Sequence, residues 1–192
     1  MRQLWTVRSR VDNCLAVREN HLPGWTDRCD DRGVLAVRRA KPADAGDCVA
    51  IVRGLPEYFT EDVPDKVAAD LLAHSTWLAV DGRTPVGFAI VERRFAHAAE
   101  ILWFAITASR RGHGVGSWLL DRVLGELSED GLRLIEVKTL DAGAGYEPYR
   151  ATRAFWEKHG FLKIDTIDPL PDWSPGNPAA IYVASLPPAL SG

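Results

Sequence analysis

A glycine-rich loop in the second half of the chain holds the residues whose types and spacing most directly indicate chemistry. Its members are Arg111, Gly112, His113, Gly114, Val115 and Gly116. Glycines lack side chains, so a phosphate group can approach the backbone N–H groups of such a loop closely. A helical pattern of apolar residues begins after the loop, and a helix N-terminus adds unpaired N–H donors and a favourable dipole. We therefore expect the loop to bind a pyrophosphate, with Arg111 adding charge or bracing the loop.

Other glycine-rich phosphate loops differ from this one in detail. A Walker loop requires a lysine between its last glycine and the serine or threonine that follows, whereas Ser117 follows Gly116 directly. A dinucleotide-binding fingerprint requires a third glycine, and Leu119 occupies that position. The remaining alternative to an anion site is a tight turn that binds nothing.

The elements that position the loop follow from the spacing of apolar residues and from turn residues. Helices are expected at 42–52, 64–73, 115–127 and 151–158, and strands at 34–38, 76–80, 86–91, 99–106, 132–139, 161–164 and 180–186. The Asp81-Gly82 pair is a strong hairpin signal between the second and third strands. This order predicts an α/β fold, and the length suits one domain over residues 33–192.

Two blocks of the sequence resemble the GNAT superfamily of acyl-CoA-dependent N-acetyltransferases. The segment from Phe104 to Leu120, which contains the glycine loop, is similar to motif A of that superfamily. The segment from Thr152 to Phe161, which contains an aromatic pair and a closing Gly-Phe, resembles its motif B. The resemblance covers residues 35–186 and leaves the N-terminal part unexplained.

The resemblance implies a mixed central sheet of about seven strands, flanked by about four helices and splayed between its fourth and fifth strands. It also implies acetyl-CoA as the co-substrate, with the pantetheine arm paired to the backbone of the fourth strand and the pyrophosphate on the loop. Besides the loop, the residues implied for cofactor binding are Phe104, Ala105, Ile106, Ser117, Phe155 and Trp156. No metal is expected.

Glu100 is the candidate general base. The resemblance implies a glutamate at this distance before the loop, which receives the proton of the acceptor amine directly or through water. An isolated carboxylate at the start of an apolar strand suits this role. The alternative is that Glu100 caps a strand edge or pairs with an arginine such as Arg93 or Arg94. No cysteine falls in the two blocks, which favours direct attack in a ternary complex over a covalent route.

Trp156 departs from the superfamily pattern. The resemblance implies a tyrosine at this position, which protonates the departing thiolate. An indole N–H donates a hydrogen bond but does not release its proton near neutral pH. Tyr149 or Tyr146 is the candidate substitute. The alternatives are that both tyrosines only line the acceptor pocket, or that water protonates the thiolate, whose pKa in solution is about 8.5.

Acidic and aromatic residues connect the first two helices, in a segment that borders the acceptor site in the superfamily. They are Glu57, Tyr58, Phe59, Glu61 and Asp62, and Trp103 is expected to contribute. Carboxylates and aromatic rings attract a cationic amine through charge and cation–π contact. We therefore expect a small-molecule amine as the partner, resembling a polyamine, an aminoglycoside or an amino acid. The alternative is a solvated acidic surface, and a homodimer is an open option.

Composition sets the broad class of the protein. The 192 residues carry a net charge of −3 without a basic stripe, so no nucleic acid partner is expected. Neither is a membrane partner, because the sequence has no apolar run of about 20 residues. The polar N-terminus and three cysteines without CxxC spacing predict a cytoplasmic location. Residues 1–32 lack a sustained apolar period, which predicts a partly disordered extension.

The sequence thus favours an enzyme that transfers an acetyl group from acetyl-CoA to a primary amine, because the loop and Glu100 serve that reaction. The alternative is a catalytically weak or inactive module that senses acyl-CoA or serves as a structural surface. Trp156 at the position of the usual acid favours this second function.

Overall fold

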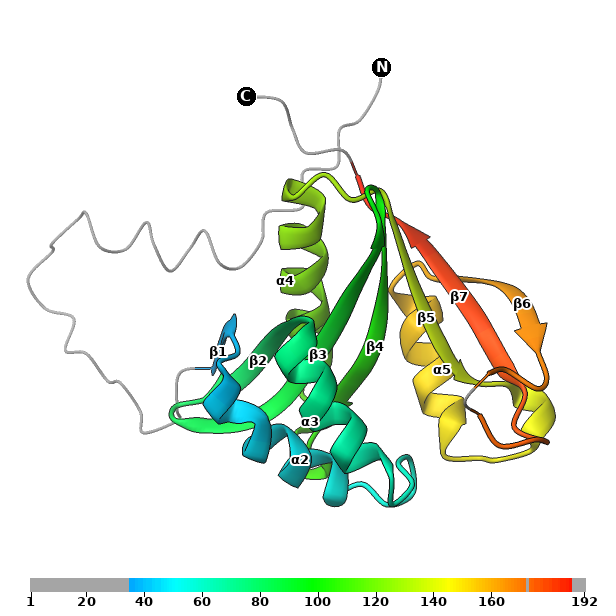
Figure 1. Cartoon of the computed structure of the whole chain (residues 1–192), viewed down its shortest axis with the longest axis horizontal. Coiled ribbons are helices and arrows are strands. Elements are labelled where there is room, and N and C mark those ends of the chain that lie inside the picture. Colours follow the sequence, from blue (N-terminus) through cyan, green and yellow to red (C-terminus); the bar gives the residue numbers. More distant parts are fainter. Residues whose placement is uncertain (1–34, 172, 188–192) are drawn as a thin grey trace, which may run out of the picture. The chain divides into compact units, whose positions relative to one another are not determined.

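The computed structural model describes residues 35–171 and 173–187, so the extension expected at 1–32 lies outside the described residues. Within them, seven strands and four α-helices follow one another in the predicted order (Figure 1). The strands are β1 (Leu35–Arg39), β2 (Ser75–Asp81), β3 (Thr84–Phe95), β4 (Ala98–Ile106), β5 (Leu134–Leu140), β6 (Leu162–Ile167) and β7 (Ala179–Ser185). The helices are α2 (Ala45–Arg53), α3 (Val63–Ala73), α4 (Val115–Glu129) and α5 (Tyr149–Lys158). The predicted fold class is therefore confirmed.

β3 and α5 are among the elements that are longer than their apolar patterns predict. β3 continues beyond Val91 through a charged segment to Phe95, because β4 pairs with it there, with Glu92 opposite Glu100. α5 begins at Tyr149 rather than at residue 151. Its first turn has no apolar repeat, so the apolar pattern does not predict this start. Both extensions carry side chains that matter for the site.

The sheet has the strand order β1-β2-β3-β4-β5-β7-β6, and only β4 and β5 are parallel within this order. These two strands pair from Ala98 opposite Leu134 to Ile101 opposite Val137, and no further. Figure 1 shows them diverging beyond that point. The rest of β4, Leu102–Ile106, therefore has backbone groups without a strand partner on the β5 side, which is the predicted splay.

A β-bulge lies at the start of the splay. The pairing between β3 and β4 passes from Ile90 opposite Trp103 to Val91 opposite Ile101, which leaves Leu102 without an opposite residue. Such bulges occur often beside active sites, because they redirect the backbone locally. The bulge thus changes the course of β4 where the two strands separate.

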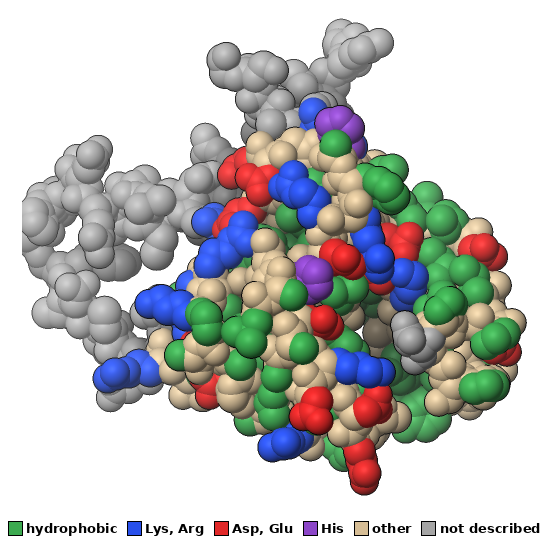
Figure 2. All heavy atoms as spheres, viewed as in Figure 1, with side chains coloured by type: hydrophobic (Ala, Val, Ile, Leu, Met, Phe, Trp, Pro, Cys, Tyr) green, Lys and Arg blue, Asp and Glu red, His purple; other side chains and the backbone are tan. Residues whose placement is uncertain are grey.

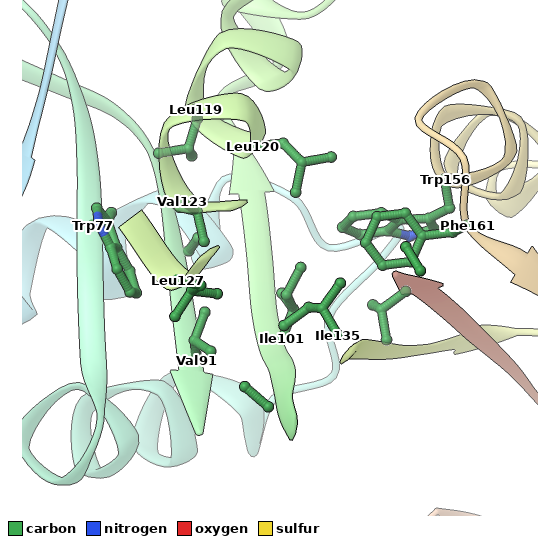
Figure 3. Packing of buried hydrophobic residues seen from close by; sticks show 14 of the residues in the cluster. Trp77, Val91, Ile101, Leu119, Leu120, Val123, Leu127, Ile135, Trp156 and Phe161 are labelled. Atoms are coloured by element: carbon green, nitrogen blue, oxygen red, sulfur yellow. The ribbon is translucent and has the colours of Figure 1, made fainter. Parts of the chain in front are cut away.

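Helices cover both faces of the sheet (Figure 1). α2 and α3 share one apolar cluster with β2, β3 and β4, whereas α4 and α5 share the other. Figure 3 shows Leu119, Leu120, Val123 and Leu127 of α4 among the core side chains of that second cluster. Burying a leucine stabilises the fold by roughly 1.5–3 kcal/mol, so this face of α4 fixes the helix and the loop before it. In the described part of the chain, no helix is long and apolar enough to cross a membrane.

A buried carboxylate joins β1 to the start of α2. Asp44 accepts hydrogen bonds from both terminal nitrogens of Arg38, at 2.7 and 2.8 Å, and from the backbone N–H of Lys41. The hydrogen bond from Arg38 is the main cause that lowers the pKa of Asp44 to about 2. This ion pair therefore stabilises the connection between β1 and α2.

Candidate active site

The glycine loop leads from β4 to α4 and presents backbone rather than side chains. Gly112 (φ +74°) and Gly114 (φ +80°) take left-handed conformations, which residues with a Cβ adopt only with strain. Gly114 is the N-cap of α4, and the first turn has neither a capping side chain nor an acidic residue. The first N–H groups of this helix are therefore available to an anion.

Gly116 lies where α4 comes closest to the splay. A Cβ at this position would meet Phe155 of α5 at 3.4 Å, Ile106 of β4 at 3.6 Å and Phe104 at 3.7 Å. The first turn of α4 is thus flanked by both strand and helix residues that the sequence assigned to the cofactor. A phosphate bound at this turn would therefore lie next to a pantetheine arm bound in the splay.

Arg111 braces the loop. Its Nε donates a hydrogen bond to the carbonyl oxygen of Ile106 at 3.1 Å. Its guanidinium lies 4.4 Å from the centre of the Tyr58 ring and 3.5 Å from a carboxylate oxygen of Glu57. Arg111 therefore connects the glycine loop to the segment between α2 and α3, which we call the α2–α3 link (residues 55–62).

A cleft of about 2180 Å³ opens at the splay, and most of the predicted site residues line it. Those that do are Glu57, Tyr58, Phe59, Glu100, Trp103, Phe104, Ala105, Ile106, Arg111, Gly112, Gly114, Gly116, Ser117, Tyr146, Tyr149, Phe155 and Trp156. His113 and Val115 do not, because His113 is exposed and Val115 is buried in the core below the loop. Figure 2 shows a hollow on this face with acidic and basic side chains around it. Among the described residues, no group of His, Cys, Asp and Glu side chains could hold a metal ion.

Glu100 lies at the narrow end of the cleft and is not isolated. It is only 5% exposed, and Arg94 donates hydrogen bonds to its Oε2, one of them at 3.0 Å. Lys138 of β5 contacts its Oε1 at 2.7 Å. Glu100 is therefore not an isolated carboxylate, and it forms an ion pair with Arg94, one of the two arginines named in the alternative. Its role as the base stays a prediction. Arg93 instead pairs with Asp130.

Lys138 is a site residue that the sequence reasoning missed. It lines the cleft, and hydrogen bonds to Glu100 and Glu136 outweigh burial and raise its pKa. The signal was the alternation of polar and buried residues in β5, which places Glu136 and Lys138 on one face. The missing information was the parallel register with β4, which brings Lys138 next to Glu100.

The α5 side of the cleft is aromatic. Trp156 is only 3% exposed and packs with ring centres 5.3 Å from Phe104 and 5.1 Å from Phe161. Figure 3 shows Trp156 and Phe161 side by side. The Trp156 indole N–H donates to no group within residues 35–171 and 173–187, although the ring borders the cleft. An indole N–H donates a hydrogen bond but does not release its proton near neutral pH.

The two tyrosines proposed as substitute acids hold the α2–α3 link. Tyr149 donates its hydroxyl hydrogen bond to the carbonyl oxygen of Tyr58 at 2.7 Å, and Tyr146 donates to that of Glu57 at 3.0 Å. In return, Tyr58 donates to the carbonyl oxygen of Pro148. Burial raises the pKa of Tyr149 to about 12, which makes it a weaker acid. Both phenols are thus engaged in joining α5 to the link across the cleft.

The part of the cleft lined by the α2–α3 link, α3 and β4 combines aromatic rings with a carboxylate that the sequence reasoning did not select. Phe59 meets Trp103 edge to face with ring centres 6.3 Å apart. The Trp103 indole donates to Asp70 of α3 at 2.6 Å, and all three residues line the cleft. Asp70 escaped notice because only folding brings α3 over β4.

Comparisons with known proteins agree with this arrangement. Residues 73–163 match the family described as Acetyltransferase (GNAT) domain. A GNAT-family protein from Desulfovibrio desulfuricans is 23% identical with a TM-score of 0.69, over 80% of this chain and 100% of the other. An aminoglycoside 6'-acetyltransferase type Ii is 19% identical, with a TM-score of 0.63 over 80% and 99% of the two chains. A GNAT family acetyltransferase from Elizabethkingia anophelis with acetyl-CoA bound is 16% identical, with a TM-score of 0.58 over 79% and 98%. No curated protein matches significantly.

Proposed function

We propose that this chain, whose residues 73–163 match the GNAT acetyltransferase domain, transfers an acetyl group from acetyl-CoA to a primary amine of a small cationic molecule. The observation that carries the proposal is the continuity of three features in one cleft. They are the open first turn of α4, the unpaired edge of β4, and Glu100 at the narrow end. The reaction proceeds by direct attack of the amine in a ternary complex.

Backbone groups do most of the proposed cofactor binding. The N–H groups at the start of α4 take the pyrophosphate, and Arg111 stands beside them. The free edge of β4 at Leu102–Ile106 pairs with the amides of the pantetheine arm as an added strand would. The bulge at Leu102 offers a backbone N–H to the thioester carbonyl, which stabilises negative charge on that oxygen during attack.

Glu100 receives the proton that the acceptor ammonium must lose. The neutral amine nitrogen then forms a bond to the thioester carbon and the carbon–sulfur bond breaks, which releases the thiolate of coenzyme A. The nitrogen loses its second proton, which the thiolate takes up through water. A thiolate with a solution pKa of about 8.5 leaves without a strong acid, and water can protonate it. Trp156 contributes a hydrogen bond to the sulfur rather than a proton, because its N–H has no other partner in the described chain.

Asp70 together with Phe59 and Trp103 gives the acceptor site its proposed preference for a cation. A carboxylate beside two aromatic rings binds an ammonium group by charge and by cation–π contact. Glu57 contributes less than the sequence suggests, because Arg111 lies 3.5 Å from its carboxylate. The aminoglycoside acetyltransferase among the similar structures is named for an acceptor of this cationic class.

An amine panel tests the proposal. We expect amine-dependent release of thiol from acetyl-CoA, followed with a thiol reagent, with polyamines, aminoglycosides and amino acids ahead of neutral amines. Reaction with neutral amines alone would contradict the cationic acceptor. Tight binding of acetyl-CoA without release for any amine would instead favour the sensor function, which the engaged tyrosine hydroxyls and Trp156 support.

A further inference from the structure

Five charged side chains form a row across three strands where the sheet begins to open. Glu92 of β3 lies opposite Glu100 of β4, and Glu100 lies beside Glu136 of β5. Arg94 and Lys138 each come two residues later on the outer strands, so they share the face of the three glutamates. We call these five residues the charge ladder. Carboxylates and cations alternate along it, and its formal net charge is minus one.

The contacts of the charge ladder run without interruption from β3 to β5. Arg94 contacts Glu92 at 2.9 Å and also Glu100. Lys138 contacts Glu100 at 2.7 Å and Glu136 at 2.8 Å. Glu100 is the central and most buried member, with a side chain 7% exposed, whereas those of Glu92 and Glu136 are 29% and 35% exposed. Both Glu100 oxygens are therefore occupied by cations.

The charge ladder faces the proposed acceptor site. Ile90 and Glu92 lie two residues apart in β3, so their β4 partners Trp103 and Glu100 point to the same face. Lys138 follows Val137, the last β5 residue paired with β4. The Lys138–Glu100 ion pair thus spans the two strands at the point where they separate. An acceptor amine that enters beside Trp103 therefore meets the Glu100 carboxylate, which lies between Lys138 and Arg94.

Two opposing effects decide how Glu100 behaves. Burial alone disfavours the charged form of a carboxylate. Neighbouring cations favour the charged form, and a cation at less than 3 Å in a buried setting has a large effect. Lys138 is 22% exposed and Arg94 is 45% exposed, so solvent screens Lys138 less. Lys138 reaches Glu100 from β5, across the opening of the sheet, whereas Arg94 reaches it from the paired strand β3.

We propose that Lys138 is the positioning residue of this site, which holds Glu100 as a fixed carboxylate at the opening of the sheet and sets how readily Glu100 accepts the acceptor proton. This inference rests on the acetyl transfer proposed above. When an ammonium arrives, it neutralises the net charge of the ladder. Proton transfer to Glu100 leaves Lys138 paired with Glu136, so no cation is stranded in the cleft.

Replacement of Lys138 by methionine tests the inference in the full chain. The side-chain carboxyl of Glu100 is followed by carbon-13 NMR during a pH titration, and kcat/KM is measured over the same pH range. Because Glu100 loses a neighbouring cation, we expect its midpoint to lie higher than in the wild type, and the acid limb of the rate profile to move with it. Lys138→Arg keeps the charge and should restore both values towards those of the wild type.

Glu136→Gln is the matched control, because it removes the other partner of Lys138 and leaves the Lys138–Glu100 contact in place. It should move the Glu100 midpoint far less than Lys138→Met. An unmoved midpoint in Lys138→Met, or a rate lowered by one factor at every pH, would show that Lys138 is only structural. If no amine reacts with the wild type, the acetyl transfer fails, whereas the NMR midpoint still decides whether Lys138 controls Glu100.

Discussion

The two walls of the splay differ in what they offer to a reaction. The β4 wall presents unpaired backbone groups over Leu102–Ile106 and a carboxylate at Glu100 that two cations hold in place. The α5 wall presents the buried indole of Trp156, and its nearest phenols are engaged with backbone carbonyls of the α2–α3 link. In the proposed reaction, the β4 wall orients the thioester and accepts a proton. The other excludes water and donates at most a hydrogen bond.

Because of this difference, we expect the attack of the amine and the departure of the thiolate to depend on different residues. In the proposed reaction, removal of the acceptor proton depends on Glu100, which Arg94 and Lys138 hold in place, so it should respond sharply to mutation. Departure of the thiolate depends on a leaving group that is already good, so it should respond weakly. The following predictions test that division.

Replacement of Glu100 by glutamine should have the largest effect, because it removes the proton acceptor of the β4 wall and keeps the shape of the side chain. We expect kcat/KM to fall about 100-fold or more, while the Kd for coenzyme A, measured by calorimetry, stays the same. Glu92→Gln, at the exposed end of the charge ladder, is the control and should change kcat/KM only a few fold. Equal losses of kcat/KM in the two variants would show that Glu100 acts only through the charge of the charge ladder and not as a proton acceptor.

The glycine loop serves both walls, so a change there should weaken binding without altering the asymmetry. Gly114→Ala puts a Cβ on a residue with φ +80°, at a cost of about 1–2 kcal/mol, and shifts the N–H groups of the first turn. We expect the Kd for coenzyme A to rise about tenfold. Gly125→Ala in the middle of α4, where an added Cβ meets nothing within 4 Å, should leave the Kd unchanged and stabilise the helix slightly. Unchanged affinity in Gly114→Ala would remove the loop from phosphate binding.

Sequence reasoning found the β4 wall more completely than the α5 wall, for physical reasons. The glycine loop and Glu100 belong to one continuous segment, so the resemblance to one superfamily covers both. The partners of Tyr146 and Tyr149 lie 89 and 91 residues away in the α2–α3 link, and nothing in the local pattern indicates them. Lys138 escaped for the same reason, because a parallel register depends on a helical crossover rather than on a turn.

The order of the last strands illustrates the same limit. β7 lies between β5 and β6, although β6 precedes it in the chain. The sequence predicts all three strands, since each has its own apolar run bounded by turn residues. The position of β7 between β5 and β6 is one of several possible strand pairings. It depends on how α5 and the rest of the core pack, which the sequence pattern does not indicate.

Replacement of Trp156 by tyrosine tests the α5 wall and should have a smaller effect. If the departing thiolate lacks an acid, a tyrosine at this position should raise kcat by a few fold, whereas Trp156→Phe, which removes the N–H, should lower it by a few fold. The comparison is made at saturating acetyl-CoA, by thiol release. A loss as large as that of Glu100→Gln in both variants would mean that the two walls contribute equally.

The smallest expected effect concerns stability and compares the halves of the sheet on either side of the splay. Asp44 joins β1 to α2, and Asp141 after β5 accepts hydrogen bonds from Lys163 and from the N–H of Gly143. The pKa of Asp44 is lowered to about 2, and that of Asp141 is also lowered, chiefly by Lys163. A carboxyl whose pKa is lower in the folded state stabilises the protein above its unfolded pKa of about 4, and this contribution is lost as the pH falls.

We therefore expect Asp44→Asn to reduce the free energy of unfolding by about 1–2 kcal/mol at pH 7, with the difference from the wild type vanishing near pH 2. Solvent screening of Arg38, whose side chain is 42% exposed, keeps the value at the lower end. Asp141→Asn should act in the same direction, and Asp121→Asn on the exposed side of α4 should change stability by less than about 0.5 kcal/mol. Because the core cluster shared by α4 and α5 spans strands on both sides of the splay, both variants should shift one cooperative transition in urea. Two separate transitions would mean that the walls fold independently, and the asymmetry would then extend from chemistry to stability.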